Sequence, residues 1–174
     1  IEGTFDDAQA LVKQLFADRA FARAHRLAAI NSINWVRIAA QAAYYVAVGR
    51  ELDRPRLTFS VPTGNFGDIF AGYVAMRMGL PIERLILATN RNDILSRFVN
   101  SGIYQARAVH HTLSPSMDIQ ISSNFERYLY YLTGEDPAAV RALLDEMGRT
   151  GRMAVSEKQQ AAVAEDFDAA ATSD

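Results

Sequence analysis

Strand-like and helix-like patterns of apolar and polar residues alternate through the middle of the chain. The clearest unit starts with Leu57–Pro62, a short run rich in strand formers, and continues with Asp68–Met78, whose pattern predicts a helix. Gly79 and Pro81 separate this helix from a second predicted strand at Arg84–Thr89. A strand, a helix and a strand in this order predict a βαβ unit. We therefore expect an α/β fold, with a three-layer, twisted, mainly parallel sheet flanked by helices.

Most of the remaining chain is predicted to be helical. Helices are expected at residues 5–24, 31–49, 93–100, 124–132 and 137–148. Ser123 followed three residues later by Glu126 forms a capping-box pattern, and Asn92 is a candidate N-cap. Gly72 is small enough to let the helix of the βαβ unit lie close to the sheet. The acidic, Ala-rich stretch at 165–174 carries no helix stop and is expected to be a frayed end or a cut.

The composition is that of a packed protein and excludes several classes of function. Of the 174 residues, 49% are hydrophobic and 22% are charged, and the formal net charge is −2. Without a basic field, we expect no nucleic-acid partner and no membrane partner. The absence of cysteine excludes disulfides, thiolate zinc sites, iron–sulfur clusters and cysteine nucleophiles. No segment reaches the ~20 apolar residues that span a bilayer.

The start of the sequence indicates an internal piece of a longer protein. Residue 1 is Ile, and the first methionine is Met76. The opening residues lack the basic start and the apolar run of a signal peptide. We therefore expect the chain to begin within a longer protein. A cytoplasmic location is expected for that protein.

The chemistry most visible in the sequence lies at Thr63-Gly-Asn-Phe-Gly-Asp68, between a predicted strand and a predicted helix. Two glycines three residues apart let the backbone turn sharply, and the following helix directs its free N–H groups and positive dipole end at a ligand. A phosphate is the expected ligand. Alternatively, Gly64 and Gly67 only shape a tight connection and Asp68 caps the helix; the spacing favours neither interpretation. The segment does not match the dinucleotide fingerprint G-x-G-x-x-G or a P-loop.

A polar stripe lies on the predicted helix at 31–49. Its members are Asn31, Asn34, Arg37 and Gln41. These positions fall within about 120° of one another at ~100° per residue, while most other positions are apolar. An almost buried helix is therefore expected to carry a guanidinium that needs an anion, because an unpaired buried charge is costly. That anion is either a substrate phosphate or an acidic side chain of the protein, and the pattern alone favours the acidic side chain.

Three other groups are weaker candidates. His110 and His111 are adjacent, so we predict strand or loop residues rather than shared metal ligands. The stretch at 112–119 has turn chemistry with three hydroxyls and a carboxylate, and it either lines a site or connects two elements. The tyrosine cluster at 128–131 predicts core packing rather than a stacking platform for bases.

Four longer motifs resemble a known family. They are Asn31-Ser-Ile-Asn-Trp-Val-Arg-Ile38, Ser60-Val-Pro-Thr-Gly-Asn-Phe-Gly-Asp-Ile69, Leu85-Ile-Leu-Ala-Thr-Asn-Arg-Asn-Asp-Ile-Leu95 and Thr112-Leu-Ser-Pro-Ser-Met-Asp-Ile119. In this order they resemble threonine synthase, a pyridoxal-phosphate enzyme of fold type II. The resemblance runs from the first residue to about residue 134, and it is far more specific than the glycine turn alone.

The resemblance implies an activity and a set of binding residues. Threonine synthases convert O-phospho-L-homoserine and water to L-threonine and phosphate, with pyridoxal phosphate as the electron sink. The backbone amides of the glycine turn are implied to hold the cofactor phosphate. The residues concerned are Gly64, Asn65, Phe66, Gly67 and Asp68. Asn31 and Arg37 are implied to bind the substrate phosphate, which replaces an acidic side chain as the expected partner of Arg37.

The sequence also departs from the family. The family holds its cofactor as a Schiff base through a lysine in a Phe-Lys-Asp context, whereas this chain has only Lys13 and Lys158, neither in that context. We therefore assign no catalytic residue to the chain. No metal site is expected either, because the two adjacent histidines cannot readily share a metal. Residues 1–174 are expected to be the central portion of the cofactor-binding catalytic region, an incomplete piece that is inactive alone. The competing interpretation is a non-catalytic phosphate- or nucleotide-binding α/β module.

Overall fold

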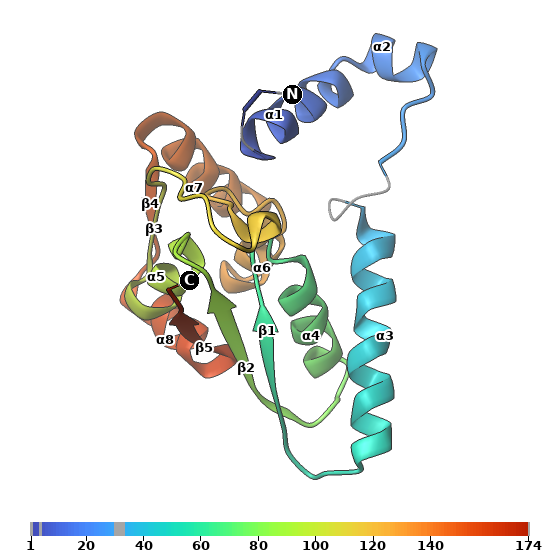
Figure 1. The fold of residues 1–174 in the computed structure, drawn as a ribbon, viewed down its shortest axis with the longest axis vertical. Helices are drawn as coiled ribbons and strands as arrows, with labels where there is room; N and C mark the ends of the chain where they lie inside the picture. The colour runs from blue at the N-terminus through green and yellow to red at the C-terminus, as the bar shows by residue number, and fades with distance from the viewer. Residues whose placement is uncertain (1, 4, 30–33, 174) are drawn as a thin grey trace.

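The computed structural model describes residues 2–3, 5–29 and 34–173. In chain order its elements are α1 (Phe5–Ala17), α2 (Arg19–Ala24), α3 (Trp35–Leu52), β1 (Leu57–Pro62), α4 (Gly67–Arg77), β2 (Ile82–Thr89), α5 (Ile94–Ser101), β3 (Ile103–Gln105), the 3₁₀ turn η1 (Pro115–Met117), α6 (Phe125–Leu132), α7 (Pro137–Thr150), β4 (Arg152–Ala154), α8 (Glu157–Asp166) and β5 (Phe167–Ala171). Figure 1 shows their arrangement. None of the helices in the described ranges is long and apolar enough to cross a membrane.

A three-stranded parallel sheet with the order β1-β2-β5 forms the centre of the fold. Leu85 of β2 pairs with Phe59 of β1 on one side and with Phe167 of β5 on the other. α4 packs against β1 and β2, while α5 and α8 contact β2 and β5. β3 and β4 form a separate antiparallel pair. The predicted α/β fold, with a parallel sheet flanked by helices, is therefore confirmed.

The βαβ unit predicted from the sequence consists of β1, α4 and β2. α4 begins at Gly67, one residue before the predicted start, and β2 begins at Ile82, two residues before it. Just past the end of β1, Thr63 N still donates to Ala88 O, so the strand pairing extends into the following turn. A frayed end is not found, because residues 167–171 form β5 and Phe167 is 1% exposed.

An aromatic cluster joins the turn after β1 to the rest of the core. It contains Phe66, Phe70, Phe125, Tyr128 and Phe167. The ring centroid of Phe66 lies 5.4 Å from that of Phe125 and 5.7 Å from that of Phe167. The Tyr128 hydroxyl donates a 2.8 Å hydrogen bond to Asp166 Oδ2, so its polar atom is satisfied. Core packing, predicted for the tyrosine cluster, is confirmed for Tyr128.

α3 lies along α4 at the outside of the molecule and runs in the same direction (Figure 1). The buried residues of α3 are Ile38, Ala42, Tyr45 and Gly49. In contrast, Val36 is 70% exposed and Tyr44 is 65% exposed. The prediction of an almost buried helix is wrong, because the part of the chain that the structure describes covers only one face of α3.

The single helix predicted at 5–24 is two helices. The Asp18 carboxylate accepts hydrogen bonds of 3.0 Å from the N–H groups of Ala20 and Phe21, and this N-cap starts α2 as a separate helix. α1 is tied to the body of the molecule by Asp6, whose Oδ2 accepts a 3.2 Å hydrogen bond from Gln120 N.

Gly72 sets how closely α4 lies against α3 and the sheet. A Cβ atom at Gly72 would lie 2.8 Å from Tyr45 Cε1 and 2.9 Å from Leu85 Cδ2. Gly72→Ala is therefore expected to lower the free energy of unfolding by about 1–3 kcal/mol, because overpacking displaces neighbouring side chains. Gly148 of α7 is the matched control: its Cβ would meet no atom within 4 Å, and Gly148→Ala is expected to stabilise by up to about 1 kcal/mol. Urea unfolding measures both changes, and an unchanged midpoint for Gly72→Ala would contradict the prediction.

Candidate functional site

The glycine turn, residues 63–68, connects the carboxyl end of β1 to the start of α4. Phe66 adopts the left-handed conformation with φ 63°, and no side chain caps the helix. The ring of Phe66 is buried in the aromatic cluster, so this residue can offer only its backbone to a ligand. The N–H groups of Gly67 and Asp68, at the start of α4, have no hydrogen-bond acceptor among the described residues. The turn therefore presents the polar start of a helix at the end of a parallel strand, as an anion-binding site requires.

The opposite side of the glycine turn is fixed by the serine segment, residues 122–124. Ser122 Oγ donates a 2.6 Å hydrogen bond to Gly64 O. Ser123 donates to Asn65 Oδ1 from its N–H at 2.6 Å and from its Oγ at 2.7 Å. The predicted capping box of Ser123 and Glu126 is therefore wrong: the Ser123 hydroxyl bonds to the turn, and α6 begins at Phe125 with no side-chain cap.

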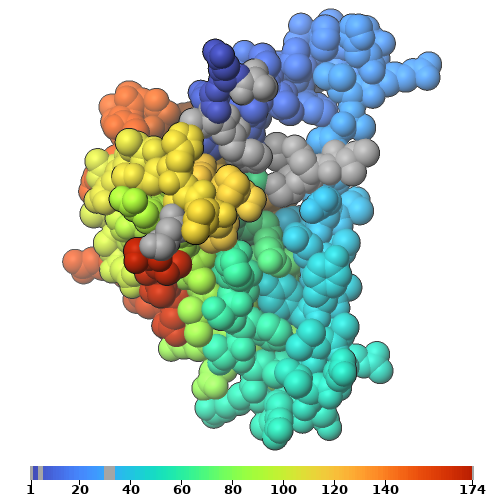
Figure 2. Space-filling view, viewed as in Figure 1, coloured from blue at the N-terminus to red at the C-terminus, as the bar shows by residue number. Residues whose placement is uncertain are grey.

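The 112–119 loop packs against the glycine turn on a second side. A Cβ atom at Gly64 would lie 2.9 Å from Met117 Cα and 3.2 Å from Ser116 O. The absence of a side chain at Gly64 is thus what allows the two backbones to touch. Figure 2 shows the segment that includes this loop, in yellow, on the surface of the molecule. The sequence left open whether the stretch lines a site or connects two elements, and the structure places it beside the turn.

Asp68 connects the turn to α3. Tyr45 Oη donates to Asp68 O at 3.0 Å and lies 3.4 Å from Asp68 Oδ1. Burial raises the pKa of the Asp68 carboxyl above its usual value, and the hydrogen bond from Tyr45 offsets part of this rise. The interpretation in which Asp68 caps α4 is wrong, because Asp68 is the second residue of the helix and Phe66 is the N-cap.

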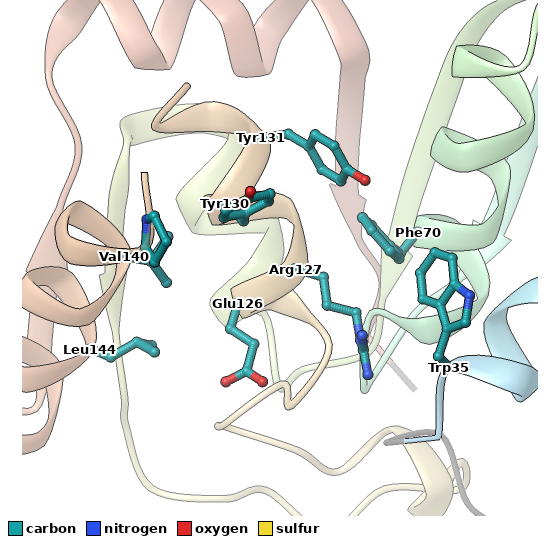
Figure 3. Close-up of a pocket in the computed structure, with 9 residues that line it drawn as sticks. Trp35, Phe70, Glu126, Arg127, Tyr130, Tyr131, Val140 and Leu144 are labelled. Atoms are coloured by element: carbon teal, nitrogen blue, oxygen red, sulfur yellow. The ribbon is translucent and has the colours of Figure 1, made fainter. Parts of the chain in front are cut away.

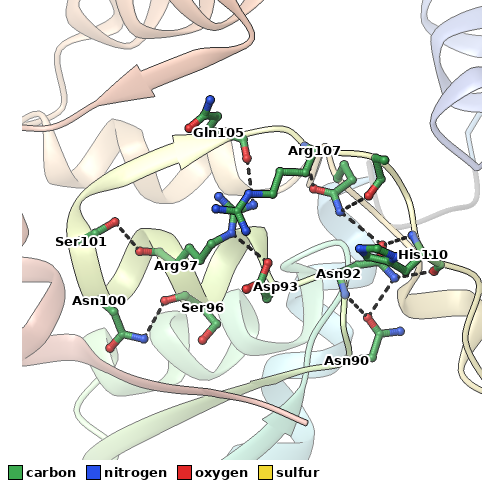
Figure 4. Close-up of polar contacts among 12 residues, drawn as sticks. Asn90, Asn92, Asp93, Ser96, Arg97, Asn100, Ser101, Gln105, Arg107 and His110 are labelled. Carbon is green, nitrogen blue, oxygen red and sulfur yellow. Dashed lines mark hydrogen bonds and ion pairs between the residues drawn. The ribbon is translucent and has the colours of Figure 1, made fainter. Parts of the chain in front are cut away.

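A buried polar cluster lies where β2 ends, next to the 112–119 loop. Its members, here called the Asp118 cluster, are Asn90, Asn92, Thr112 and Asp118. Asp118 Oδ1 accepts hydrogen bonds from Thr112 Oγ1 at 2.7 Å, Asn90 Nδ2 at 2.8 Å and Asn92 Nδ2 at 3.0 Å. The predicted N-cap role of Asn92 is wrong, because its side chain bonds to Asp118 instead. The Asn92 side chain also bonds to the backbone of His110 (Figure 4).

Sequence reasoning missed these supporting residues. Asn90 and Asn92 are 2% and 3% exposed, and Asn124 is 0% exposed. The available signal was the position of Asn90 and Asn92, two amides directly after a strand whose sequence is mostly apolar. Polar residues there lie at the carboxyl edge of a parallel sheet, where such folds bind their ligands.

Of the two residues implied to bind the substrate phosphate, the structure describes only Arg37. Asn31 lies outside the described residues. Arg37 is exposed, and its side chain makes no hydrogen bond or salt bridge within the described part of the chain. The acidic partner that the pattern alone favoured for Arg37 is therefore not found among the described residues. Because α3 and α4 run in the same direction, the start of α3 lies at the same end of the molecule as the glycine turn (Figure 1). Trp35, the first residue of α3, contacts Phe70 in the first turn of α4, with the two ring centroids 6.4 Å apart.

A cavity of about 340 Å³ opens beside the start of α3. Figure 3 shows Trp35, Phe70, Arg127 and Tyr131 around it. The Arg127 guanidinium lies 5.6 Å from the centroid of the Trp35 ring. The glycine turn does not line this cavity. His110 and His111 lie elsewhere, exposed in the loop after β3, and no group of three metal-binding side chains occurs in the described residues.

Comparison with known sequences finds that the chain is similar to a family of enzymes. The threonine synthase of Pseudomonas aeruginosa is 52% identical over 176 residues, which cover 100% of this chain and 38% of that protein. The threonine synthase of Saccharomyces cerevisiae is 54% identical over 140 residues, which cover 78% of this chain and 27% of that protein. No family model matches the chain.

Solved structures agree with this result. The crystal structure of PLP-bound threonine synthase from Brucella melitensis matches with a TM-score of 0.88 and 55% identity, covering 99% of this chain and 38% of that one. The chain is homologous to a section of the threonine synthases. Threonine synthase from Escherichia coli matches with a TM-score of 0.76 at 32% identity, covering 100% of this chain and 36% of that one. The chain thus spans well under half the length of the threonine synthases that it matches.

The Asp118 cluster predicts a dependence of stability on pH. Burial disfavours the charge of Asp118, yet hydrogen bonds from Thr112 and Asn90 hold the pKa of its carboxyl below the usual 3.8. A carboxyl whose pKa is lowered by folding stabilises the folded state above its unfolded pKa and loses this contribution as the pH falls. Asp118→Asn is therefore expected to lower the free energy of unfolding by about 1–3 kcal/mol near neutral pH. The difference in the free energy of unfolding between Asp118→Asn and wild type should shrink as the pH falls below 3.8. Urea unfolding over a pH series measures it, and a constant difference would contradict the prediction.

Proposed function

We propose that this chain is part of a threonine synthase, and that its glycine turn holds the phosphate of pyridoxal phosphate. The whole enzyme would convert O-phospho-L-homoserine and water to L-threonine and phosphate, as a carbon–oxygen lyase in the last step of threonine biosynthesis. Residues 1–174 would form the central portion of its cofactor-binding catalytic region. A cytoplasmic location stays a prediction.

The uncapped start of α4 is the observation that carries this proposal. Its first N–H groups have no acceptor in the described structure, while Gly64 O and Asn65 Oδ1 are bonded to the serine segment. A phosphate oxygen would satisfy these N–H groups, and the positive end of the helix dipole would stabilise its charge. The residues present therefore fit the phosphate of the cofactor.

Each proposed binding residue has a defined task. The backbone amides of Gly64, Asn65, Phe66, Gly67 and Asp68 would surround the cofactor phosphate. Asn31 and Arg37 would bind the substrate phosphate, which a guanidinium can hold in a bidentate manner. The parallel arrangement of α3 and α4 supports this assignment, since both helices start at one end of the molecule. Bound pyridoxal phosphate supplies the electron sink that the reaction needs.

A non-catalytic phosphate- or nucleotide-binding module is not favoured. Such a module would account for the glycine turn, but it would not account for 52% identity across the entire chain to a threonine synthase. The fold agreement with the Brucella melitensis structure over 99% of the chain argues in the same direction.

Phosphate binding at the turn is directly testable. Titration of the 174-residue chain with pyridoxal phosphate, and separately with inorganic phosphate, is expected to shift the backbone amide NMR signals of residues 64–68. Gly67→Asp should abolish these shifts, because a carboxylate would add negative charge to the anion site. Gly148→Asp is the control, since Gly148 faces open space on α7, and it should bind like wild type. Unchanged turn signals in folded wild-type protein would contradict the proposal.

The chain alone is expected to be inactive. Its lysines, Lys13 and Lys158, lie on α1 and α8, and neither stands in the Phe-Lys-Asp context in which the family holds its cofactor. Release of phosphate from O-phospho-L-homoserine by a pure sample, with pyridoxal phosphate added, measures this. Turnover above a no-protein control would show that the chain is catalytically complete.

A further inference from the structure

The 112–119 loop packs directly against the glycine turn. Because Gly64 has no side chain, the loop and the turn touch through their backbones: a Cβ atom added to Gly64 would lie 2.9 Å from Met117 Cα. Backbone contacts of this kind transmit a displacement directly, since no flexible side chain lies between them to absorb it. Whatever holds the loop therefore also limits where the turn can lie.

Asp118 holds the loop in place. Its Oδ1 accepts three hydrogen bonds from Thr112, Asn90 and Asn92, and its Oδ2 accepts a fourth from Thr112 N at 3.0 Å. Asp118 is 7% exposed, so these charge-assisted bonds have little competition from water. Two of the donors, Asn90 and Asn92, follow directly after β2, which pairs with β1 up to Pro62 and Ala88. The end of the sheet, the loop and the turn are thus linked in a closed ring of contacts.

We infer that Asp118 is a positioning residue for the phosphate-binding turn, because its buried carboxylate fixes the 112–119 loop against Gly64. The effect on phosphate binding rests on the proposed function of the turn, whereas the contact between the loop and Gly64 does not. An amide cannot replace the carboxylate here, since four donors surround two acceptor oxygens and an NH₂ group would face donors. Asp118 does not touch the expected phosphate in this role; it acts through the backbone of the loop.

Two pairs of variants test the inference. Asp118→Asn removes the charge, and Leu113→Ala is its control, because Leu113 lies in the same loop and is 91% exposed. Thr112→Val removes the hydroxyl that bonds to Asp118 without changing the shape, and Thr112→Ser keeps that hydroxyl. The Thr112 pair remains informative even if Asp118→Asn folds poorly.

The first readout is amide hydrogen exchange, without any ligand. The N–H groups of Ser123 and Phe70 report on the turn, because they bond to Asn65 Oδ1 and Phe66 O. Leu87 in β2 reports on the core. Asp118→Asn and Thr112→Val are expected to speed exchange at Ser123 and Phe70 about tenfold more than at Leu87, while Thr112→Ser and Leu113→Ala stay near wild type.

The second readout is the affinity for inorganic phosphate and for pyridoxal phosphate. A loss of about tenfold is expected for Asp118→Asn and Thr112→Val, comparable to the loss when groups that orient binding residues are removed. Thr112→Ser should restore wild-type affinity. A merely structural role would not separate Thr112→Val from Thr112→Ser in this way.

The outcomes separate the inference from the proposed function. Exchange that rises equally at the turn and at Leu87, or only within the loop, would overturn the positioning role of Asp118. If wild-type protein binds neither phosphate nor pyridoxal phosphate, the proposed function fails, and the exchange data alone then decide whether Asp118 fixes the turn. Equal phosphate affinity in wild type and Thr112→Val, with binding intact, would also overturn the inference.

Discussion

The site depends on one constraint: the turn after β1 must leave the first N–H groups of α4 without an internal acceptor while the rest of the turn is fixed. The left-handed conformation of Phe66 meets this constraint and costs about 1–2 kcal/mol for a residue other than glycine. Burial of the Phe66 ring in the aromatic cluster offsets the cost, since a fully buried Phe contributes about 1.5–3 kcal/mol. The hydrophobic core thus holds a backbone conformation that local preferences disfavour.

The two ends of the sheet have different chemistry. At the amino end of β1, Gly49 lies against the apolar side chains of Leu57 and Leu80. At the carboxyl end, the Asp118 cluster and the serine segment bury amides, hydroxyls and a carboxylate that form hydrogen bonds within the protein. Buried polar groups are costly unless they are satisfied, so such a network specifies one arrangement of the loops around the turn.

The supporting contacts come from widely separated parts of the chain. The glycine turn is 58 residues from the serines that bond to it, and Asn90 is 28 residues from Asp118. Helix α4 also bonds to α3 through Tyr45 and Asp68, which are 23 residues apart. These contacts require the strand ends to lie side by side in the folded βαβ unit, and so the binding geometry is a property of the folded chain.

The sequence by itself determined the βαβ unit, the α/β class and the glycine turn, because hydrophobic period, strand formers and glycine spacing act locally. It also carried the motifs that resemble threonine synthase. Only the tertiary structure decided that Ser123 bonds to Asn65 instead of capping α6, that Asn92 bonds to Asp118, and that α3 keeps an exposed apolar face. Local patterns indicate which side chains can form a hydrogen bond or be buried. The hydrogen-bond partners, and the helices and strands that bury a face, are distant in sequence, so tertiary packing determines them.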